Sequence, residues 1–263
     1  MVVIALALLG LCFGSFVNAL VWRVHEKKAI VATRSQCVRC GHQLSAADLV
    51  PILSWVVLRG RCRYCKESIS AQYPLVEIVC AAVFVASYYF WPTRIAGGQW
   101  VLLATWLAVS VGLLALAVYD LRWMILPSNI LYPTAAVAVF GRLVYVVGFE
   151  RNYGSALLHW ALSVLVASGI FWALFMISSG RWIGYGDIRL GLVTGTVLSS
   201  PAKSFLMIFL ASALGTLFVI PLLITKRQSF SSKLPYGPFL ILSTALTLLF
   251  GDPIIGWYQR LLM

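Results

Sequence analysis

The stretch "WVLLATWLAVSVGLLALAVYD", Trp100 to Asp120, decides the fold of this chain. An uncharged run of about 20 residues is what a helix needs to cross the hydrocarbon core of a bilayer. A carboxylate at membrane depth costs roughly 2.5–3.5 kcal/mol, so Asp120 at the end of this run indicates a function.

The whole chain has the composition of a membrane protein. Of its 263 residues, 61% are hydrophobic and 11% are charged, whereas soluble domains carry about 25% charged residues. We therefore predict an all-α polytopic membrane protein with about eight transmembrane helices. The spans are expected near 1–22, 74–92, 100–120, 128–148, 155–178, 187–200, 203–225 and 236–258, of which 187–200 is short and rich in glycine.

Lys and Arg predict the orientation. The first span has no basic residues before it and three just after it, which favours an uncleaved anchor with its N-terminus outside over a cleaved signal peptide. Fifteen Lys and Arg then lie on the side of segment 23–73, four lie on the other side, and Arg142 falls inside a span. The positive-inside rule places 23–73 in the cytoplasm. The net charge of +12 is thus mostly topological, and without a basic patch interleaved with aromatic residues no nucleic-acid partner is expected.

These boundaries predict three parts. Residues 1–22 form the first anchor, 23–73 a cytoplasmic tetracysteine domain, and 74–263 a multi-helix membrane domain surrounded by lipid.

The cytoplasmic segment contains "CVRC" and "CRYC", with Cys37, Cys40, Cys62 and Cys65. Two C-x2-C pairs at this spacing predict a structural four-thiolate zinc site, because each pair offers two sulfurs to a tetrahedral ion. Disulfides or redox motifs are the alternative, which a cytoplasmic location disfavours. His42 is an alternative ligand, although a solvated or supporting histidine is the simpler interpretation. A segment this small would draw most of its folding energy from the metal.

A second carboxylate lies in "WIGYGDIRLG", where Asp187 follows Gly184 and Gly186. With the predicted topology, Asp120 and Asp187 lie at one depth on the cytoplasmic side. Asp187 also fits the N-cap of a helix, and Glu77, on the same side, simply complements a helix dipole. Two carboxylates that share a site cannot both ionise easily, so one holds a proton while the other activates water.

This chemistry predicts an aspartic protease with Asp187 as the ionised base and Asp120 as the protonated acid. Gly184 and Gly186 are expected to let an extended substrate backbone approach the pair.

Several longer motifs follow one another along the chain: "GSFVNALVWR" (Gly14 to Arg23), the tetracysteine segment, "ISAQYPLVE" (Ile69 to Glu77), "YDLRWMILP", "GYGD" and "LPYGPFL" (Leu234 to Leu240). Together they resemble the type IV prepilin peptidases, membrane aspartic proteases of the GxGD type. The resemblance implies catalytic aspartates at Asp120 and Asp187 and zinc ligands at the four cysteines.

The same resemblance implies the substrates and the second activity. Prepilin or pseudopilin precursors would lose a basic leader after a glycine, at the cytoplasmic face of the bacterial inner membrane. The new N-terminus would then be methylated from S-adenosylmethionine. Asn18 and Glu77 are candidates for binding that cofactor, although Asn18 also fits an interhelical hydrogen bond.

This chain departs from the family pattern at two positions near the aspartates. Ser128 stands where many members have an aspartate, and Arg189 stands close to a common lysine. Neither departure touches the predicted pair.

Other functions would use only some of these features. A zinc-knuckle scaffold needs the thiols without the aspartates, and a cleavage-only or presenilin-type GxGD protease needs the aspartates without the tetracysteine segment. A proton-coupled transporter would place its acids near the midplane, within repeats. The sequence does not predict the oligomeric state.

Overall fold

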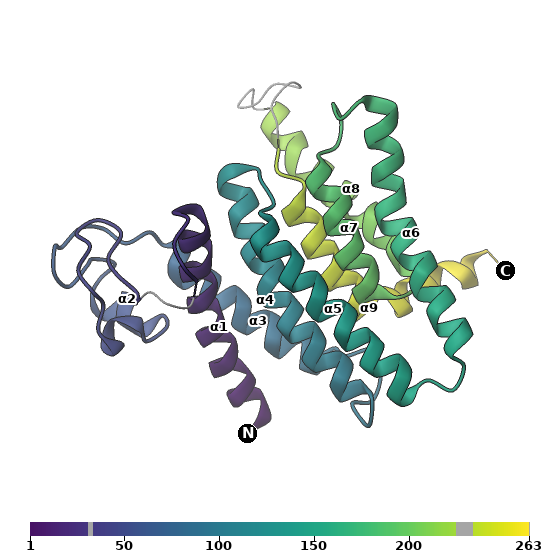
Figure 1. Cartoon of the computed structure of the whole chain (residues 1–263), viewed down its shortest axis with the longest axis horizontal. Helices are drawn as coiled ribbons and strands as arrows, with labels where there is room; N and C mark the ends of the chain where they lie inside the picture. The colour runs from purple at the N-terminus through teal and green to yellow at the C-terminus, as the bar shows by residue number, and fades with distance from the viewer. Residues whose placement is uncertain (31–33, 225–233, 263) are drawn as a thin grey trace. The chain divides into compact units, whose positions relative to one another are not determined.

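The computed structural model describes residues 1–30, 34–224 and 234–262. Within these ranges every regular element is helical, apart from two isolated β-bridges (Figure 1). The elements are α1 (Val2–His25), the short 3-10 helix η1 (Ala46–Leu49), α2 (Leu53–Val57), α3 (Gln72–Tyr89), α4 (Gln99–Trp123), α5 (Ser128–Phe149), α6 (Tyr153–Ser178), α7 (Tyr185–Leu198), α8 (Pro201–Ile224) and α9 (Gly237–Leu261). The predicted all-α class is confirmed.

Seven helices of the described chain are long and apolar enough to cross a membrane, namely α1, α3, α4, α5, α6, α8 and α9. Large apolar side chains on them, such as Phe140 and Leu217, are about 70% exposed. Such apolar surfaces suit contact with acyl chains rather than with water. The chain is a multi-pass membrane protein.

The expected span at 187–200 differs from the other seven. It forms α7, a helix of 14 residues, which is ~21 Å long against a hydrocarbon core of ~30 Å. The helix ends where Ser199 adopts a left-handed conformation with φ 48° and Pro201 opens α8. At 14 residues α7 is shorter than the seven helices above, and its role as an eighth span stays a prediction.

The expected span at 203–225 corresponds to α8. The last residue of the expected span, residue 225, lies outside the described residues. So do Lys226, Arg227 and Lys233, which contribute to the predicted topology.

The chain divides into two compact units. The first unit comprises Met1–Tyr89 with Ser110–Ala115, and the second comprises Phe90–Val109 with Leu116–Met263. The three-part division at 22/23 and 73/74 was based on topology rather than on compactness, and it stays a prediction.

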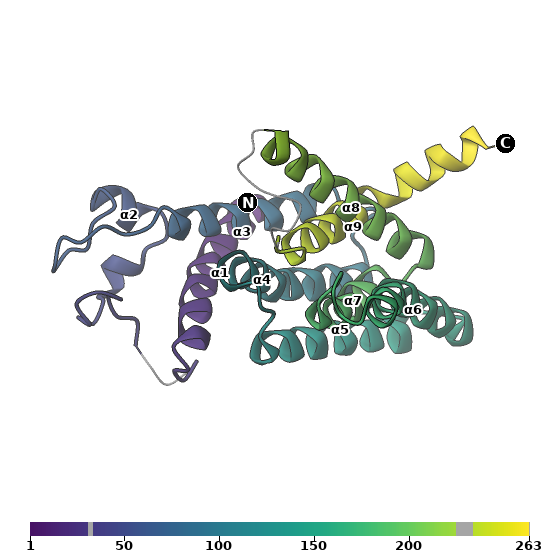
Figure 2. The same ribbon diagram turned by 90° about the horizontal axis from the view of Figure 1, so that it is seen from above.

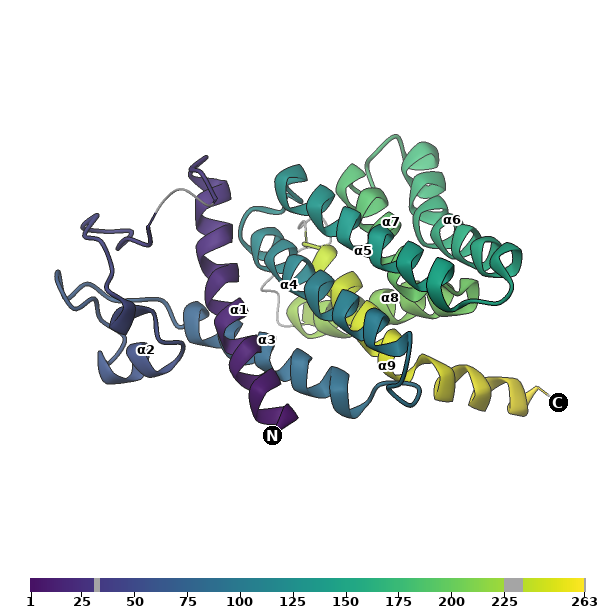
Figure 3. The same cartoon turned by 60° about the horizontal axis from the view of Figure 1, so that its bottom comes forward.

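In the first unit, α1 packs closely across α3 (Figure 3). Gly10 and Gly14 lie one turn apart on α1, and a Cβ at either would lie 2.6 Å or less from the Cα of Ala81 or Glu77. This is the G-x-x-x-G arrangement that lets two membrane helices approach through their backbones.

In the second unit, α7 packs against α5, α6, α8 and α9, and it lies among them in two views (Figures 1 and 2). Gly191 and Gly195 bring it against α6, because Cβ atoms there would lie 2.6 Å from the Ala167 carbonyl oxygen and 2.8 Å from the Val164 Cα. The Ser163 hydroxyl also donates to the Gly195 carbonyl at 2.8 Å. The helix that carries Asp187 is therefore held by backbone contact.

Candidate active site and metal centre

Asp120 lies in the last turn of α4, which ends at Met124 in a left-handed conformation with φ 53°. Its side chain is buried, with 6% exposure. Oδ2 accepts a hydrogen bond of 3.1 Å from the backbone N–H of Gly237, at the start of α9. A buried carboxylate of this kind is held in place by a main-chain donor rather than by a flexible side chain.

Asp187 lies in the first turn of α7, behind the N-cap residue Gly184. The backbone of Gly184 hydrogen-bonds to the Asp187 carboxylate. The expected N-cap role therefore falls to Gly184, and the Asp187 carboxylate faces back over the start of the helix, where a negative charge is favoured.

The two carboxylates lie in the same unit and act on each other electrostatically. Leu126, buried at 6% exposure, lies between the elements that carry them. Its side chain is within 3.1 Å of a Cβ position built on Gly186 and within 3.6 Å of one built on Gly237. The hairpin from α4 to α5 thus packs against the starts of both α7 and α9, and this contact gathers the two acids.

Gly237, in the motif "LPYGPFL", was not predicted from the sequence as a residue of the site. A Cβ at this position would lie 2.7 Å from Oδ2 of Asp120, so any other residue would displace the carboxylate. Neighbouring Tyr236 interacts electrostatically with Asp187, and its ring packs edge-on against Phe171 at 5.9 Å. Both residues belong to the motif LPYGPFL, but the motif alone does not show that they lie beside the aspartates.

The two positions that depart from the family pattern contact each other. The Arg189 guanidinium donates to the Ser128 hydroxyl at 2.8 Å, and it lies over the Tyr185 ring at 5.1 Å. Its buried Nε has no hydrogen-bond partner among the described residues. The pair links the start of α5 to the helix of Asp187 without using either aspartate.

The four predicted cysteines form a cluster in the first unit. Their Sγ atoms all lie within 4.8 Å of one another, and those of Cys37 and Cys65 are 3.9 Å apart. Tetrahedral zinc with Zn–S bonds of about 2.3 Å needs sulfurs roughly 3.8 Å apart. The donor set and its spacing therefore fit a four-thiolate metal site.

The cluster consists of two knuckles built alike. A β-bridge joins the residue before each first cysteine to the third residue after each second one, Gln36 to Gln43 and Arg61 to Ser68. The residue after each second cysteine has a positive φ, 72° at Gly41 and 60° at Lys66. Glycine adopts this conformation in the first knuckle, and the second knuckle adopts it without glycine.

The second knuckle is held by polar contacts to η1 and by a ring contact to the first knuckle. Asp48 binds Arg63 of the second knuckle at 2.6 Å and accepts from the Tyr64 hydroxyl at 3.1 Å. The rings of Tyr64 and His42 contact each other with centroids 3.6 Å apart, tilted by 32°. Burial opposes ionisation of Asp48, but hydrogen bonds led by Arg63 lower its pKa to about 2. His42 lies outside the group of four ligand atoms, in a supporting role.

Asn18 and Glu77 are both engaged within the first unit. The Asn18 amide donates to the Tyr73 carbonyl oxygen at 3.0 Å, and buried Glu77 accepts from the Ile52 N–H at 2.7 Å. These contacts join α1 and the tetracysteine segment to α3. They support the interhelical role of Asn18, and no cofactor contact is derived from either residue.

Fold and site together define a polytopic helical membrane protein with a paired-carboxylate site and a separate thiol cluster. Two family models match this sequence: the Bacterial Peptidase A24 N-terminal domain over residues 8–91, and the Type IV leader peptidase family over residues 107–220.

Similar curated proteins carry the name prepilin leader peptidase/N-methyltransferase. The protein of Aeromonas salmonicida is 34% identical over 89% of this chain and 77% of its own length. Those of Pseudomonas putida and Burkholderia pseudomallei are each 30% identical, over 97% and 93% of this chain and 92% and 84% of their own lengths. No solved structure matches the chain. The chain belongs to the type IV leader peptidase family.

Proposed function

We propose that this protein is a bacterial inner-membrane prepilin leader peptidase and N-methyltransferase, with Asp120 and Asp187 as its proteolytic pair. The observation that carries the proposal is geometric: Leu126 packs beside both Gly186, next to Asp187, and Gly237, and the Gly237 N–H holds Asp120. Neither the zinc-knuckle scaffold nor the transporter alternative accounts for this convergence near one end of the helices.

The pair divides the work of hydrolysis between its two members. Asp187 takes a proton from water as the oxygen attacks the scissile carbonyl, and Asp120 donates a proton to the carbonyl oxygen. Since Oδ2 of Asp120 accepts from Gly237, Oδ1 carries the proton. As the tetrahedral intermediate collapses and the C–N bond breaks, the leaving amine takes the proton that Asp187 removed from water, and Asp120 regains its proton from the hydroxyl that becomes the carbonyl.

The substrate strand is proposed to lie along Gly184 and Gly186. Gly184 is exposed, as are the neighbouring Trp182 and Tyr185, so this side of the pair is open. A peptide bond inside a helix is shielded by its own hydrogen bonds, and these glycines would let an extended stretch reach the acids instead.

The four cysteines are proposed to hold structural zinc. Bound zinc would supply folding energy to a segment with little core of its own, and a site closed by four thiolates leaves no position for a substrate. The names of the relatives include an N-methyltransferase activity, and S-adenosylmethionine is proposed as its methyl donor.

The orientation proposed from Lys and Arg has the N-terminus outside, with the tetracysteine segment and the aspartates on the cytoplasmic side. The helix ends are consistent with placing both aspartates on one side of the membrane. Asp120 lies at the end of α4, Asp187 at the start of α7 and Gly237 at the start of α9.

The test is the mass of the mature N-terminus after purified protein is incubated with a prepilin-like substrate and S-adenosylmethionine. We expect loss of the leader and gain of one methyl group, with neither change for Asp187→Ala. Glu26→Gln, at the exposed C-cap of α1, serves as the matched acidic control and should behave as the wild type.

Cleavage without methylation would retain the peptidase and remove the transferase. If substrates with a panel of different leaders all stayed uncut while the protein still held zinc, the scaffold function would be favoured.

A further inference from the structure

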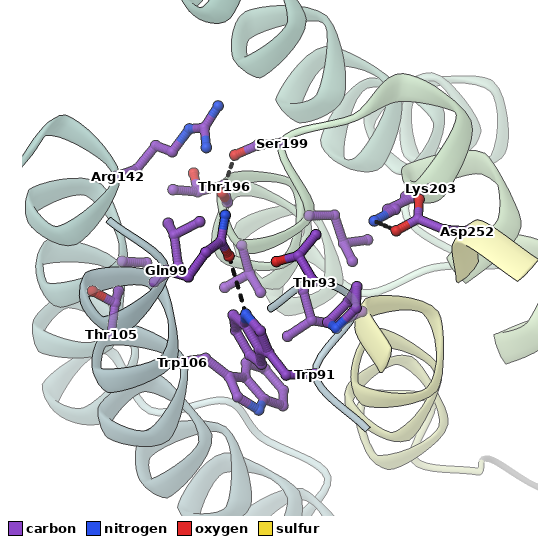
Figure 4. Close-up of a pocket in the computed structure, with 16 residues that line it drawn as sticks. Trp91, Thr93, Gln99, Thr105, Trp106, Arg142, Thr196, Ser199, Lys203 and Asp252 are labelled. Carbon is purple, nitrogen blue, oxygen red and sulfur yellow. Dashed lines mark hydrogen bonds and ion pairs between the residues drawn. The ribbon is translucent and has the colours of Figure 1, made fainter. Parts of the chain in front are cut away.

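A cavity of about 200 Å³ lies in the second unit, apart from the aspartates. It is lined by α4, α5, α7, α8, α9 and the segment before α4, which contribute Trp91, Gln99, Thr105, Arg142, Lys203 and Asp252 (Figure 4). A water occupies about 30 Å³ of liquid, so the space admits a polar group of several heavy atoms.

The cavity lies toward the far ends of the helices that carry the proteolytic pair. Thr105 is about four turns, roughly 20 Å, from Asp120 along α4, and Arg142 is equally far from Ser128 along α5. Since the hydrocarbon core is ~30 Å thick, this distance brings the cavity close to the opposite headgroup region. Trp91, just before α4, lines it, in keeping with the preference of tryptophan for that level.

Arg142 is the feature of the cavity that needs an explanation. It lies within the transmembrane helix α5, and its Nε is buried without a hydrogen-bond partner in the described chain. Its guanidinium lies 5.3 Å from the Tyr145 ring, and Glu150 acts on it only through the longer-range electrostatic interaction. A cation at membrane depth is costly unless it is paired.

The second cation of the cavity is already neutralised. Lys203 binds Asp252 at 2.8 Å, so the lining is left with the positive charge of Arg142. Gln99 adds a donor, because its Oε1 accepts from the Trp91 indole at 3.0 Å. Figure 4 shows the amide nitrogen of Gln99 on the side of Arg142. The Ser199 hydroxyl donates to the Thr196 carbonyl at 2.7 Å, which reduces the negative potential at the end of α7.

We propose that this cavity binds a phosphate-class oxyanion through Arg142 and Gln99, and that its source is the headgroup of an anionic phospholipid. The planar guanidinium suits bidentate binding of phosphate oxygens. The level of the cavity and the presence of Trp91 favour a lipid over free phosphate. The proposal stands independently of the peptidase.

Native mass spectrometry of the full chain in detergent tests it, with phosphatidylglycerol, diacylglycerol and inorganic phosphate as probes. We expect phosphatidylglycerol to bind about tenfold more tightly than diacylglycerol, and Arg142→Gln to remove that preference. Arg260→Gln, an exposed arginine of α9 that donates to Gly256, is the matched control and should keep it.

A second variant acts in the opposite direction. Asp252→Asn frees Lys203, and since Asp252 is 57% exposed, its replacement leaves the fold intact. We expect phosphatidylglycerol to bind about threefold more tightly, as an added positive charge predicts. The Asp252→Asn variant also tests whether the cavity binds phosphatidylglycerol if Arg142→Gln does not fold.

The remaining outcomes are equally direct. Equal phosphatidylglycerol binding by the wild type and both cavity variants overturns the proposal. Inorganic phosphate that binds through Arg142, with no preference for phosphatidylglycerol over diacylglycerol, keeps the oxyanion site but overturns the lipid source. Unfolding of Arg142→Gln together with unchanged binding by Asp252→Asn assigns Arg142 to structure alone.

Discussion

The backbone N–H of Gly237 donates to Oδ2 of Asp120 at 3.1 Å, across 117 positions of the sequence. Since a Cβ at Gly237 would lie 2.7 Å from that oxygen, Gly237→Ala must displace the carboxylate. We expect cleavage to fall about 100-fold, the usual effect of a misplacement near 1 Å, while the variant stays folded. Gly256→Ala, on the same helix with open space around it, is the control. A Gly237→Ala enzyme of normal activity would separate this contact from catalysis.

Replacing either aspartate tests the division of roles. Asp120→Asn and Asp187→Asn should each lower the cleavage rate by about 10²–10⁴, the usual contribution of a general acid or base, without changing metal content. If Asp187 is the base and Asp120 the acid, the residual activities should differ in pH dependence. Identical pH–rate profiles would remove the support for that assignment, since a coupled pair titrates as a unit.

The two knuckles provide a matched pair of substitutions. Lys66 has a φ of 60°, a conformation that costs a non-glycine residue roughly 1 kcal/mol. Lys66→Gly should therefore slow the loss of zinc to a chelator. Gly41→Ala, at φ 72° with nothing within 4 Å, should speed it through backbone strain alone. Opposite signs for the two variants are the expected result, and the same sign for both would refute the explanation from backbone strain.

Metal removal should unfold one part of the chain only. We expect about one zinc per chain, and a chelator should abolish hydrogen-exchange protection around the knuckles while the long helices keep theirs.

Acid should have the same local effect as the chelator, because zinc binding requires thiolates. The folded-state pKa of Asp48 is lowered to about 2 from 3.8, so its stabilising contribution is complete above pH 3.8 and is lost as the pH falls through about 2. Loss of protection near pH 5 is therefore assigned to the thiols. If Asp48→Asn shifted that midpoint strongly, the assignment would be wrong.

The close approach of α1 and α3 depends on two glycines. A side chain at Gly10 would meet the backbone of Ala81 at 2.6 Å, so Gly10→Leu should push the helices apart. We expect a lower Tm and a loosened Asn18–Tyr73 hydrogen bond. Gly148→Leu, on α5 with nothing within 4 Å, should leave the Tm almost unchanged. Equal effects of the two variants would count against the glycine contact.

The predictions from sequence were strongest where chemistry depends on local spacing. Cysteines two residues apart, and apolar runs of membrane length, indicate their structures without knowledge of distant residues. Gly237 was not predicted because its partner Asp120 lies in another helix. The need for a glycine at a close contact can be seen only when the neighbouring atoms are known.

Two further features also depend on packing. The bounds of the short α7 were predicted to within two residues, although hydropathy does not show that Ser199 ends the helix in a left-handed turn. Arg142 was noted inside a span, but only the structure shows its buried Nε and the cavity beside it. For Arg142 the deciding feature is a cavity whose lining residues are far apart in the chain.

The glycine contact between α6 and α7 has a mechanical consequence. With backbone atoms touching at Gly191 and Gly195, α7 has no layer of side chains on which to slide or rotate, so Asp187 moves only with α6. Asp120, near the end of α4 and held by one main-chain donor, is the easier of the two to shift. We therefore expect the distance between the two carboxylates to change during a catalytic cycle through movement of α4 and α9, while α6 and α7 stay fixed to each other.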